Sequence, residues 1–134
     1  MMPHPILDGA CALPLADETA FLDATAQADL VRRKEVTPAE LVEAAIGRIE
    51  RVNPQLNAVV TEMYDHGRET AAAAIRPGPF AGVPFLMKDF LAEYAGFRFT
   101  EASAFLKDFV ADNDTELVTR FKRAGLLTIG KTNA

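Results

Sequence analysis

The stretch TPAELVEAAIGRIERVNP, which begins at Thr37, constrains the fold most, because it combines a helix start with a helical hydrophobic pattern. Thr37 can cap a first turn, a proline follows it, and Glu40 stands three residues after the cap. Apolar residues then recur at helical spacing until Asn53 and Pro54, which form a stop signal because a residue before proline avoids the helical conformation. The sequence therefore predicts an amphipathic helix over residues 37–52.

The rest of the chain alternates between helical and strand-like segments. Short β-rich or apolar runs predict strands over residues 56–63, 81–90 and 126–129. Further helical patterns cover residues 18–34, 64–75 and 113–124, and an irregular connection covers residues 91–113. This alternation is typical of helices layered on a β-sheet, so we expect an α/β fold.

The last predicted helix has recognisable ends. Asn113 can cap its first turn, with Glu116 three residues further on, and Gly125 suits the position after its last turn. The eight residues from Gly125, GLLTIGKT, also fit the phosphate-loop pattern G-x-x-x-x-G-K-[ST]. A phosphate loop follows a strand and opens a helix, whereas here Gly125 follows a helix and strand formers come next. The sequence therefore favours a strand over nucleotide binding, with Lys131 as a charged residue where the strand surfaces.

Composition excludes several classes of function. The 134 residues suffice for one domain with a core, and the net charge of −5 argues against nucleic acid and against an anionic membrane surface as partners. One cysteine, Cys11, and two histidines do not make a disulfide or a metal cluster, so we expect no metal and no cofactor.

The first 17 residues carry three prolines and no periodicity, which predicts an N-terminal arm over residues 1–17 and a domain portion over residues 18–134. The arm has no basic segment of the kind that opens a signal peptide. No run approaches the ~18 apolar residues that a membrane span needs. We therefore expect a cytoplasmic protein without membrane contact.

Lys88 closes the apolar run AGVPFLMK and is the first candidate for chemistry. The apolar residues before it would strip water from its ammonium group and favour the neutral amine that a general base needs. A lone lysine at a strand end is nevertheless usually solvated, so the residues alone leave its role open. Asp89 comes next, but adjacent strand residues point to opposite faces, so it is not automatically the counter-ion of Lys88.

Four segments, in the same order along the chain, resemble the amidase signature family. FAGVPFLMKDF is similar to the segment that carries the family's catalytic lysine. The other three are TPAELVEAAIGRIERVNPQLNAVVT, GFRFTEAS and DNDTELVTRFKRAGLLTIGKTNA. The resemblance implies the N-terminal part of the family's layered fold, with helices packed on a mixed β-sheet and truncated at the C-terminus. The letters Gly-Lys-Thr-Asn then belong to this sheet.

The resemblance also implies an amide-bond hydrolase that works through an acyl-serine intermediate and a Ser–cis-Ser–Lys triad. Lys88 matches the family's catalytic lysine, whereas both serines of the family's triad lie downstream of Gly-Lys-Thr-Asn and outside this chain. Ser103 is the only serine present, and we interpret it as structural or site-lining. In the same segment, Phe99 and Ala102 replace the usual threonine and glycine.

We therefore expect the chain alone to be inactive and marginally stable, because a truncated sheet leaves an unpaired edge and uncovered apolar faces. The expected partners are a small-molecule amide substrate and either a second copy of the chain or the missing C-terminal portion. Two alternatives stay open, namely a non-catalytic module and a fragment of the amidase component of an amidotransferase complex.

Overall fold

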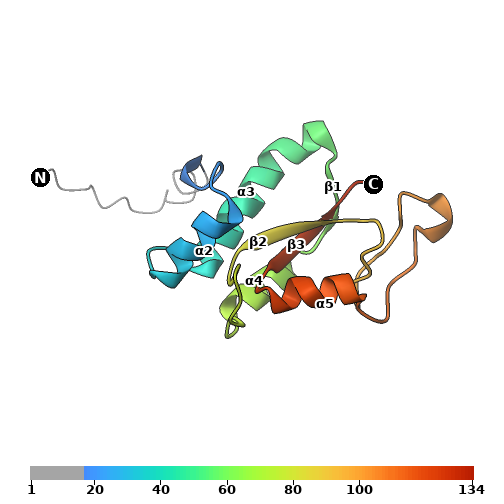
Figure 1. Cartoon of the computed structure of the whole chain (residues 1–134). Coiled ribbons are helices and arrows are strands. Elements are labelled where there is room, and N and C mark those ends of the chain that lie inside the picture. Colours follow the sequence, from blue (N-terminus) through green and yellow to red (C-terminus); the bar gives the residue numbers. More distant parts are fainter. Residues whose placement is uncertain (1–16) are drawn as a thin grey trace, which may run out of the picture.

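The computed structural model describes residues 17–134 (Figure 1). Its regular helices and strands, in chain order, are α2 (Ala24–Arg32), α3 (Pro38–Leu56), β1 (Val59–Glu62), α4 (Tyr64–Ala72), β2 (Pro84–Lys88), the short 3₁₀-helix η1 (Ala104–Leu106), α5 (Glu116–Arg123) and β3 (Leu127–Thr132). Cys11 and nearly all of the expected arm lie outside the described residues. The division at residue 17 therefore stays a prediction.

The described strands form one sheet in the order β1-β3-β2, so the last strand in sequence is the central one. Strand β1 pairs antiparallel with β3, and β2 pairs parallel with β3. The expected α/β fold with a mixed sheet is confirmed. Because β2 and β3 run in the same direction, their carboxyl ends, Lys88 and Thr132, lie side by side in the register.

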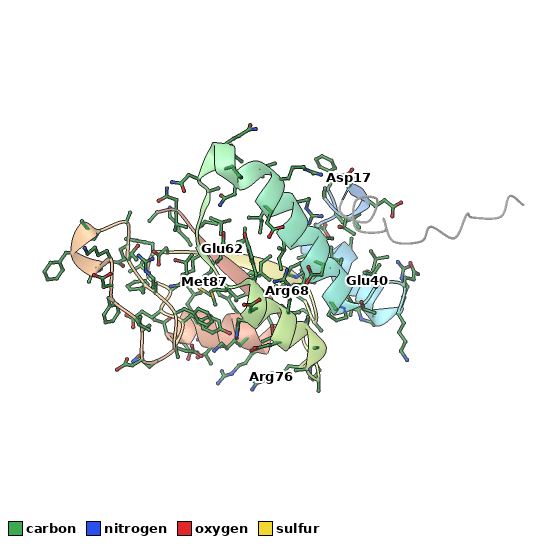
Figure 2. All side chains as sticks on the ribbon, turned by 180° about the vertical axis from the view of Figure 1, so that it is seen from behind. Asp17, Glu40, Glu62, Arg68, Arg76 and Met87 are labelled. Carbon is green, nitrogen blue, oxygen red and sulfur yellow. The ribbon has the colours of Figure 1, made fainter. Side chains whose placement is uncertain are left out.

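Two hydrophobic clusters lie on the two faces of this sheet. On one face, Ile129 packs with buried residues of α3 and α4, and Leu86 joins them. On the other face, Met87 packs with Tyr94 and with Val118 of α5. The alternation between Leu86 and Met87 follows from the strand geometry, in which successive side chains point to opposite faces. Figure 2 shows Met87 near the middle of the molecule.

Helix α3 begins as predicted. The Thr37 side chain accepts a hydrogen bond from the Glu40 amide, and the Glu40 side chain accepts one from the Thr37 amide, which completes a capping box. The expected end at Asn53 is wrong, because the helix continues to Leu56 with Pro54 inside it. A further turn closes beyond the proline, since the Asn57 amide donates to the Asn53 carbonyl at 2.8 Å.

The other helix ends are set by specific caps. Helix α2 begins at Ala24, later than expected, because the Asp23 side chain accepts a hydrogen bond from the Ala26 amide. The expectation that Asn113 caps α5 is wrong, since Thr115 is its N-cap and accepts from the Val118 amide at 3.5 Å.

The expected end of α5 at Gly125 is confirmed. Gly125 has φ +89°, and its amide donates to the Lys122 carbonyl while the Leu126 amide donates to the Phe121 carbonyl. This pair of bonds is a Schellman motif, which uses a left-handed residue after the helix. An added Cβ at Gly125 would lie 2.6 Å from the Cα atom of Ala81, so a side chain would also clash there.

Candidate active site at the carboxyl end of strand β2

Lys88 is the last residue of β2 and is exposed to solvent. It lies on the same strand face as Leu86, but at the strand end, where the described residues leave it uncovered. The apolar residues before Lys88 in sequence do not surround its amine, so the lysine is solvated in this chain, and its burial by further polypeptide stays a prediction. Among residues 17–134 the Lys88 side chain has no hydrogen-bond or ion-pair partner, so its amine is free to meet a further group.

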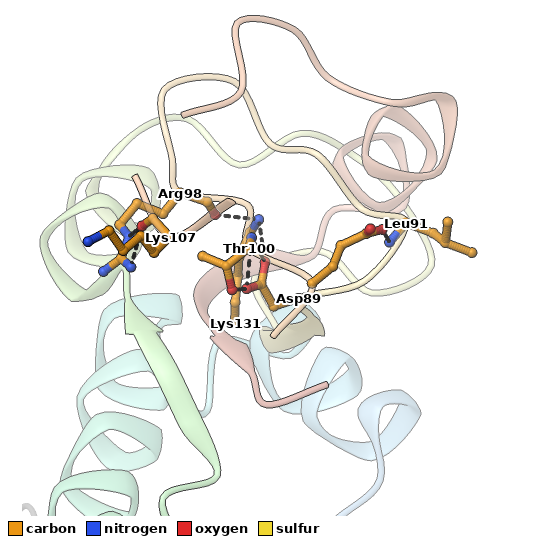
Figure 3. Close-up of polar contacts among 7 residues, drawn as sticks. Asp89, Leu91, Arg98, Thr100, Lys107 and Lys131 are labelled. Carbon is orange, nitrogen blue, oxygen red and sulfur yellow. Dashed lines mark hydrogen bonds and ion pairs between the residues drawn. The ribbon is translucent and has the colours of Figure 1, made fainter. Parts of the chain in front are cut away.

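Asp89 follows directly and has the opposite environment, with an exposed fraction of only 1%. Its carboxylate accepts hydrogen bonds from the Thr100 amide at 3.1 Å and from the Thr100 hydroxyl at 2.5 Å (Figure 3). It also forms an ion pair with Lys131, with 3.3 Å between the ammonium nitrogen and a carboxylate oxygen. Asp89 therefore ties the end of β2 to β3 and to the loop that contains Thr100.

Lys131 is fully enclosed, with an exposed fraction of 0%. Its Nζ atom donates to Asp89 and, at 2.7 Å, to the Arg98 carbonyl, and it lies 5.0 Å from the centre of the Phe99 ring. Burial lowers the pKa of the Lys131 amine, and the charge of Asp89 partly opposes that shift. The expectation that Lys131 surfaces is therefore wrong, because a carboxylate from a distant segment accompanies it into the interior.

The phosphate-loop letters belong to a strand, as expected. Gly130 and Lys131 lie within β3, and the enclosed ammonium group of Lys131 is not available to a phosphate. Close packing explains why a glycine stands at position 130, because an added Cβ would lie 3.0 Å from the Thr61 carbonyl oxygen and 3.0 Å from a Val59 methyl group. Gly130 and Lys131 therefore have structural roles within the β-sheet and do not form a phosphate-binding loop.

The loop after β2 turns sharply beside Asp89. The Ser103 amide donates to the Thr100 carbonyl at 2.8 Å, and the two residues between them, Glu101 and Ala102, have φ values of +49° and +54°. The Ser103 hydroxyl accepts a hydrogen bond from the Phe105 amide and is the N-cap of η1. This contact gives the only serine of the chain a structural task.

Sequence reasoning proposed Lys88 from the family resemblance but did not predict the group formed by Asp89, Thr100 and Lys131. One signal was available, since Asp89 and Lys131 are opposite charges at the ends of two apolar runs that are both expected to be strands. Two such strands pair side by side, and the charges could then compensate each other. The described residues contain no group of three or more His, Cys, Asp or Glu side chains that could hold a metal ion.

The arrangement offers one exposed amine at the carboxyl ends of two parallel strands, next to a buried, hydrogen-bonded network. Ligands of open α/β sheets commonly bind at this edge. An amine there can accept and return a proton, which is general acid–base chemistry. Within the described part of the chain, no helix is both long enough and apolar enough to cross a membrane.

Comparison with known proteins identifies the family. The Amidase family model matches residues 40–134, and the chain therefore belongs to the amidase family. The chain is 42% identical over 113 residues to 6-aminohexanoate-cyclic-dimer hydrolase of Paenarthrobacter ureafaciens, covering 83% of this chain and 22% of that protein. It is 34% identical over 123 residues to a glutamyl-tRNA(Gln) amidotransferase subunit of Carboxydothermus hydrogenoformans, covering 87% and 25%.

Solved structures agree with this assignment. A 6-aminohexanoate cyclic dimer hydrolase complexed with substrate matches with a TM-score of 0.77 and 41% identity, over 84% of this chain and 23% of that one. A bacterial aryl acylamidase of the amidase signature enzymes matches with a TM-score of 0.76 and 34% identity, over 85% and 25%. The chain thus spans about a quarter or less of the length of these relatives.

Proposed function

We propose that this chain is the N-terminal portion of an amide-bond hydrolase and that Lys88 is its catalytic proton carrier. The observation that carries the proposal is the family match together with an exposed amine at the carboxyl end of β2 that has no partner among residues 17–134. Its relatives include hydrolases of amides, which supports the reaction class. The amide itself is a small molecule, and we propose the cytoplasm as its setting.

In the proposed reaction, two serines from the remainder of the polypeptide complete the site. One serine hydroxyl attacks the amide carbonyl, and its proton passes through the second serine to the Lys88 amine. The resulting ammonium group returns the proton to the leaving nitrogen, so that the C–N bond breaks and an acyl-serine remains. Water then hydrolyses the acyl-serine by the same proton route.

This cycle requires a neutral Lys88 amine at its start. The amine is exposed in this chain, and contact with the remaining polypeptide would favour the neutral form, because burial penalises a charge. The exposure of Lys88 is thus compatible with the proposal, and it supports the expectation that the chain alone is inactive.

The test is a chimera in which residues 18–134 replace the matching segment of the Paenarthrobacter ureafaciens hydrolase. We expect the folded chimera to hydrolyse that enzyme's cyclic dimer, and Lys88→Ala to lower kcat by about 10²–10⁴-fold, the usual size of a general acid–base contribution. Lys34→Ala, at an exposed lysine, is the matched control and should leave kcat unchanged. A folded but inactive chimera, or a Lys88→Ala variant within tenfold of its parent, would overturn the proposal.

A second candidate function is supported by the 34% identity to the glutamyl-tRNA(Gln) amidotransferase relative. In that case the same amide chemistry would take place within a complex. A parallel chimera built on that relative distinguishes the two candidates. Activity only in the presence of the other components of the complex would favour the second candidate, and activity on the cyclic dimer alone would favour the first.

A further inference from the structure

The buried carboxylate of Asp89 connects three segments that are distant in sequence. Strand β2 leads into Asp89 itself, β3 supplies Lys131, and the loop after β2 supplies Thr100 (Figure 3). Lys131 also donates to the Arg98 carbonyl, so the same ammonium group holds the loop a second time. The ion pair at the centre of these contacts is enclosed, since Asp89 and Lys131 have exposed fractions of 1% and 0%.

Such a buried pair is weak evidence for stability. Removing two charges from water has a large desolvation penalty, and an apolar pair of similar volume often stabilises a fold equally well. Buried ion pairs can instead specify one arrangement among several, because only one geometry satisfies every donor and acceptor. The position of the Asp89–Lys131 pair therefore indicates which part of the structure it holds in one arrangement.

The pair acts directly on the peptide that carries Lys88. The Asp89 amide donates to the Thr132 carbonyl at 3.0 Å, and the Asp89 carboxylate is held by Thr100 and Lys131. Both the backbone and the side chain of Asp89 are thus fixed. Adjacent strand residues point to opposite faces of the sheet. When the Asp89 side chain is held on one face, the Lys88 side chain must therefore leave the strand on the opposite face.

We propose that Asp89, Thr100 and Lys131 are positioning residues that orient Lys88 toward the reacting groups. This inference rests on the proposed role of Lys88 and deepens it. Because the ion pair is enclosed, the network acts through Lys88, and its effect is on the rate of the chemical step and not on substrate binding. A misplacement of about 1 Å in such a group is enough to lower a rate by about 10²-fold.

The most discriminating variants are at Thr100, because they are mild. Thr100→Val has the same shape but removes the hydroxyl that donates to Asp89, whereas Thr100→Ser keeps that donor. In the hydrolase chimera we expect Thr100→Val to lower kcat at least about tenfold with KM within about twofold, and Thr100→Ser to remain within about threefold of the parent. Equal kcat values for the two variants would overturn the inference.

A second comparison uses the ion pair itself. Asp89→Asn and Lys131→Met each leave one buried charge without its partner, whereas the double variant leaves none. We expect each single variant to lower kcat by about 10²-fold or more, and the double variant to lower it less than either single one. Additive losses in the double variant would contradict a joint action of the two residues.

Loss of stability alone must be separated from loss of orientation. Val42→Ala creates a cavity in the hydrophobic cluster between the sheet and helices α3 and α4, which does not include Asp89, Thr100 or Lys131. Val42 has an exposed fraction of 0%. This control should lower the unfolding midpoint but leave kcat per folded enzyme unchanged. If Lys88→Ala abolishes turnover while Thr100→Val does not change it, the positioning inference alone is wrong. If Lys88→Ala remains active, the proposed function is wrong and the inference falls with it.

Discussion

Ala102 occupies a backbone position that ordinarily requires glycine. Glu101 and Ala102 both have positive φ values, and the Ser103 amide closes the turn on the Thr100 carbonyl. Positive φ at both central residues is the pattern of a type I′ turn, for which glycine is strongly preferred at the second position. The family resemblance places a glycine at the same point. The contacts of Thr100 with Asp89 hold the turn in place despite the strained alanine.

We therefore predict that Ala102→Gly stabilises the protein by about 1 kcal/mol, because it removes the steric penalty of a left-handed L-residue. The measurement is the urea unfolding midpoint of the chain. Ala39→Gly is the control with the opposite sign, because it places glycine in the first turn of α3, where it should destabilise by about 0.5–1 kcal/mol. An Ala102→Gly variant that is less stable than the parent would refute the turn assignment.

The two lysines show what local sequence can and cannot predict. The residues around Lys88 left its burial open and those around Lys131 predicted exposure, whereas Lys88 is exposed and Lys131 is buried. Burial of a charge depends on a partner, and the partner of Lys131 is 42 residues away in sequence. Neighbouring letters do not contain that information. The role of Lys88 came from the family resemblance and stays a prediction.

At the scale of elements, helix α4 is joined to the loop after β2 by an aromatic group. His66 of α4 is hydrogen-bonded to the Tyr94 hydroxyl at 2.7 Å, and its ring lies 5.1 Å from that of Phe97. Burial lowers the pKa of His66, and the positive charge of Lys122 lowers it further, against the opposing charges of Glu69 and Asp114. Burial also raises the pKa of Tyr94 to about 12. The folded protein therefore favours a neutral imidazole at this contact.

This pKa shift predicts a loss of stability in mild acid. The unfolded chain takes up a proton at His66 near pH 6.5, while the folded chain resists protonation until a lower pH. The contribution of His66 is complete above about pH 6.5 and declines as the pH falls from there toward the folded pKa. The measurement compares the urea midpoints of the parent and of His66→Gln from about pH 7.5 to pH 5. The midpoint of the parent should fall more steeply with acid than that of the variant, which lacks the titrating imidazole. Parallel curves for the two proteins would contradict the prediction.

Each described α-helix and β-strand was predicted to exist, but several ends were misplaced, and the short η1 lies in a segment that was expected to be irregular. The misplaced helix starts depend on which of several suitable side chains makes the cap. Asp23 caps α2, so this helix begins after the expected start at residue 18, and Thr115 caps α5, although Asn113 has suitable chemistry two residues earlier. A cap is chosen by where packing places the backbone, so these boundaries follow from the tertiary fold. The end of α3 differs for the related reason that its last turn closes at Asn57 after the proline.

At the scale of the whole molecule, many large apolar side chains face solvent. The segment over residues 90–110 carries the residues Phe90, Leu91, Phe105, Phe109 and Val110, all exposed. The exposed apolar surface that this segment carries is of the kind that contacts another chain segment or another molecule. Because the chain covers only 22% of the length of its hydrolase relative, we propose that the remaining polypeptide covers this surface in a longer protein.

The chain alone should consequently associate with itself through this surface. We predict that the apparent size in gel filtration or sedimentation increases with protein concentration. The double variant Leu91→Ser/Phe105→Ser should weaken this concentration dependence. It should not shift the unfolding midpoint, since the two side chains are 66% and 94% exposed. Phe21→Ser is the matched control, because Phe21 is 99% exposed but lies beside α2. A monomer at every concentration, or an equal effect of the control, would refute this use of the surface.

The strand order has a consequence for how a cell makes this protein. The ribosome synthesises both outer strands, β1 and β2, before it reaches β3, which is the only described strand that pairs with either of them. During that interval the nascent polypeptide carries two strand-forming segments whose backbone N–H and C=O groups do not yet have their hydrogen-bond partners in β3. Delayed pairing of this kind slows folding and exposes a growing chain to aggregation, which is the situation that chaperones relieve.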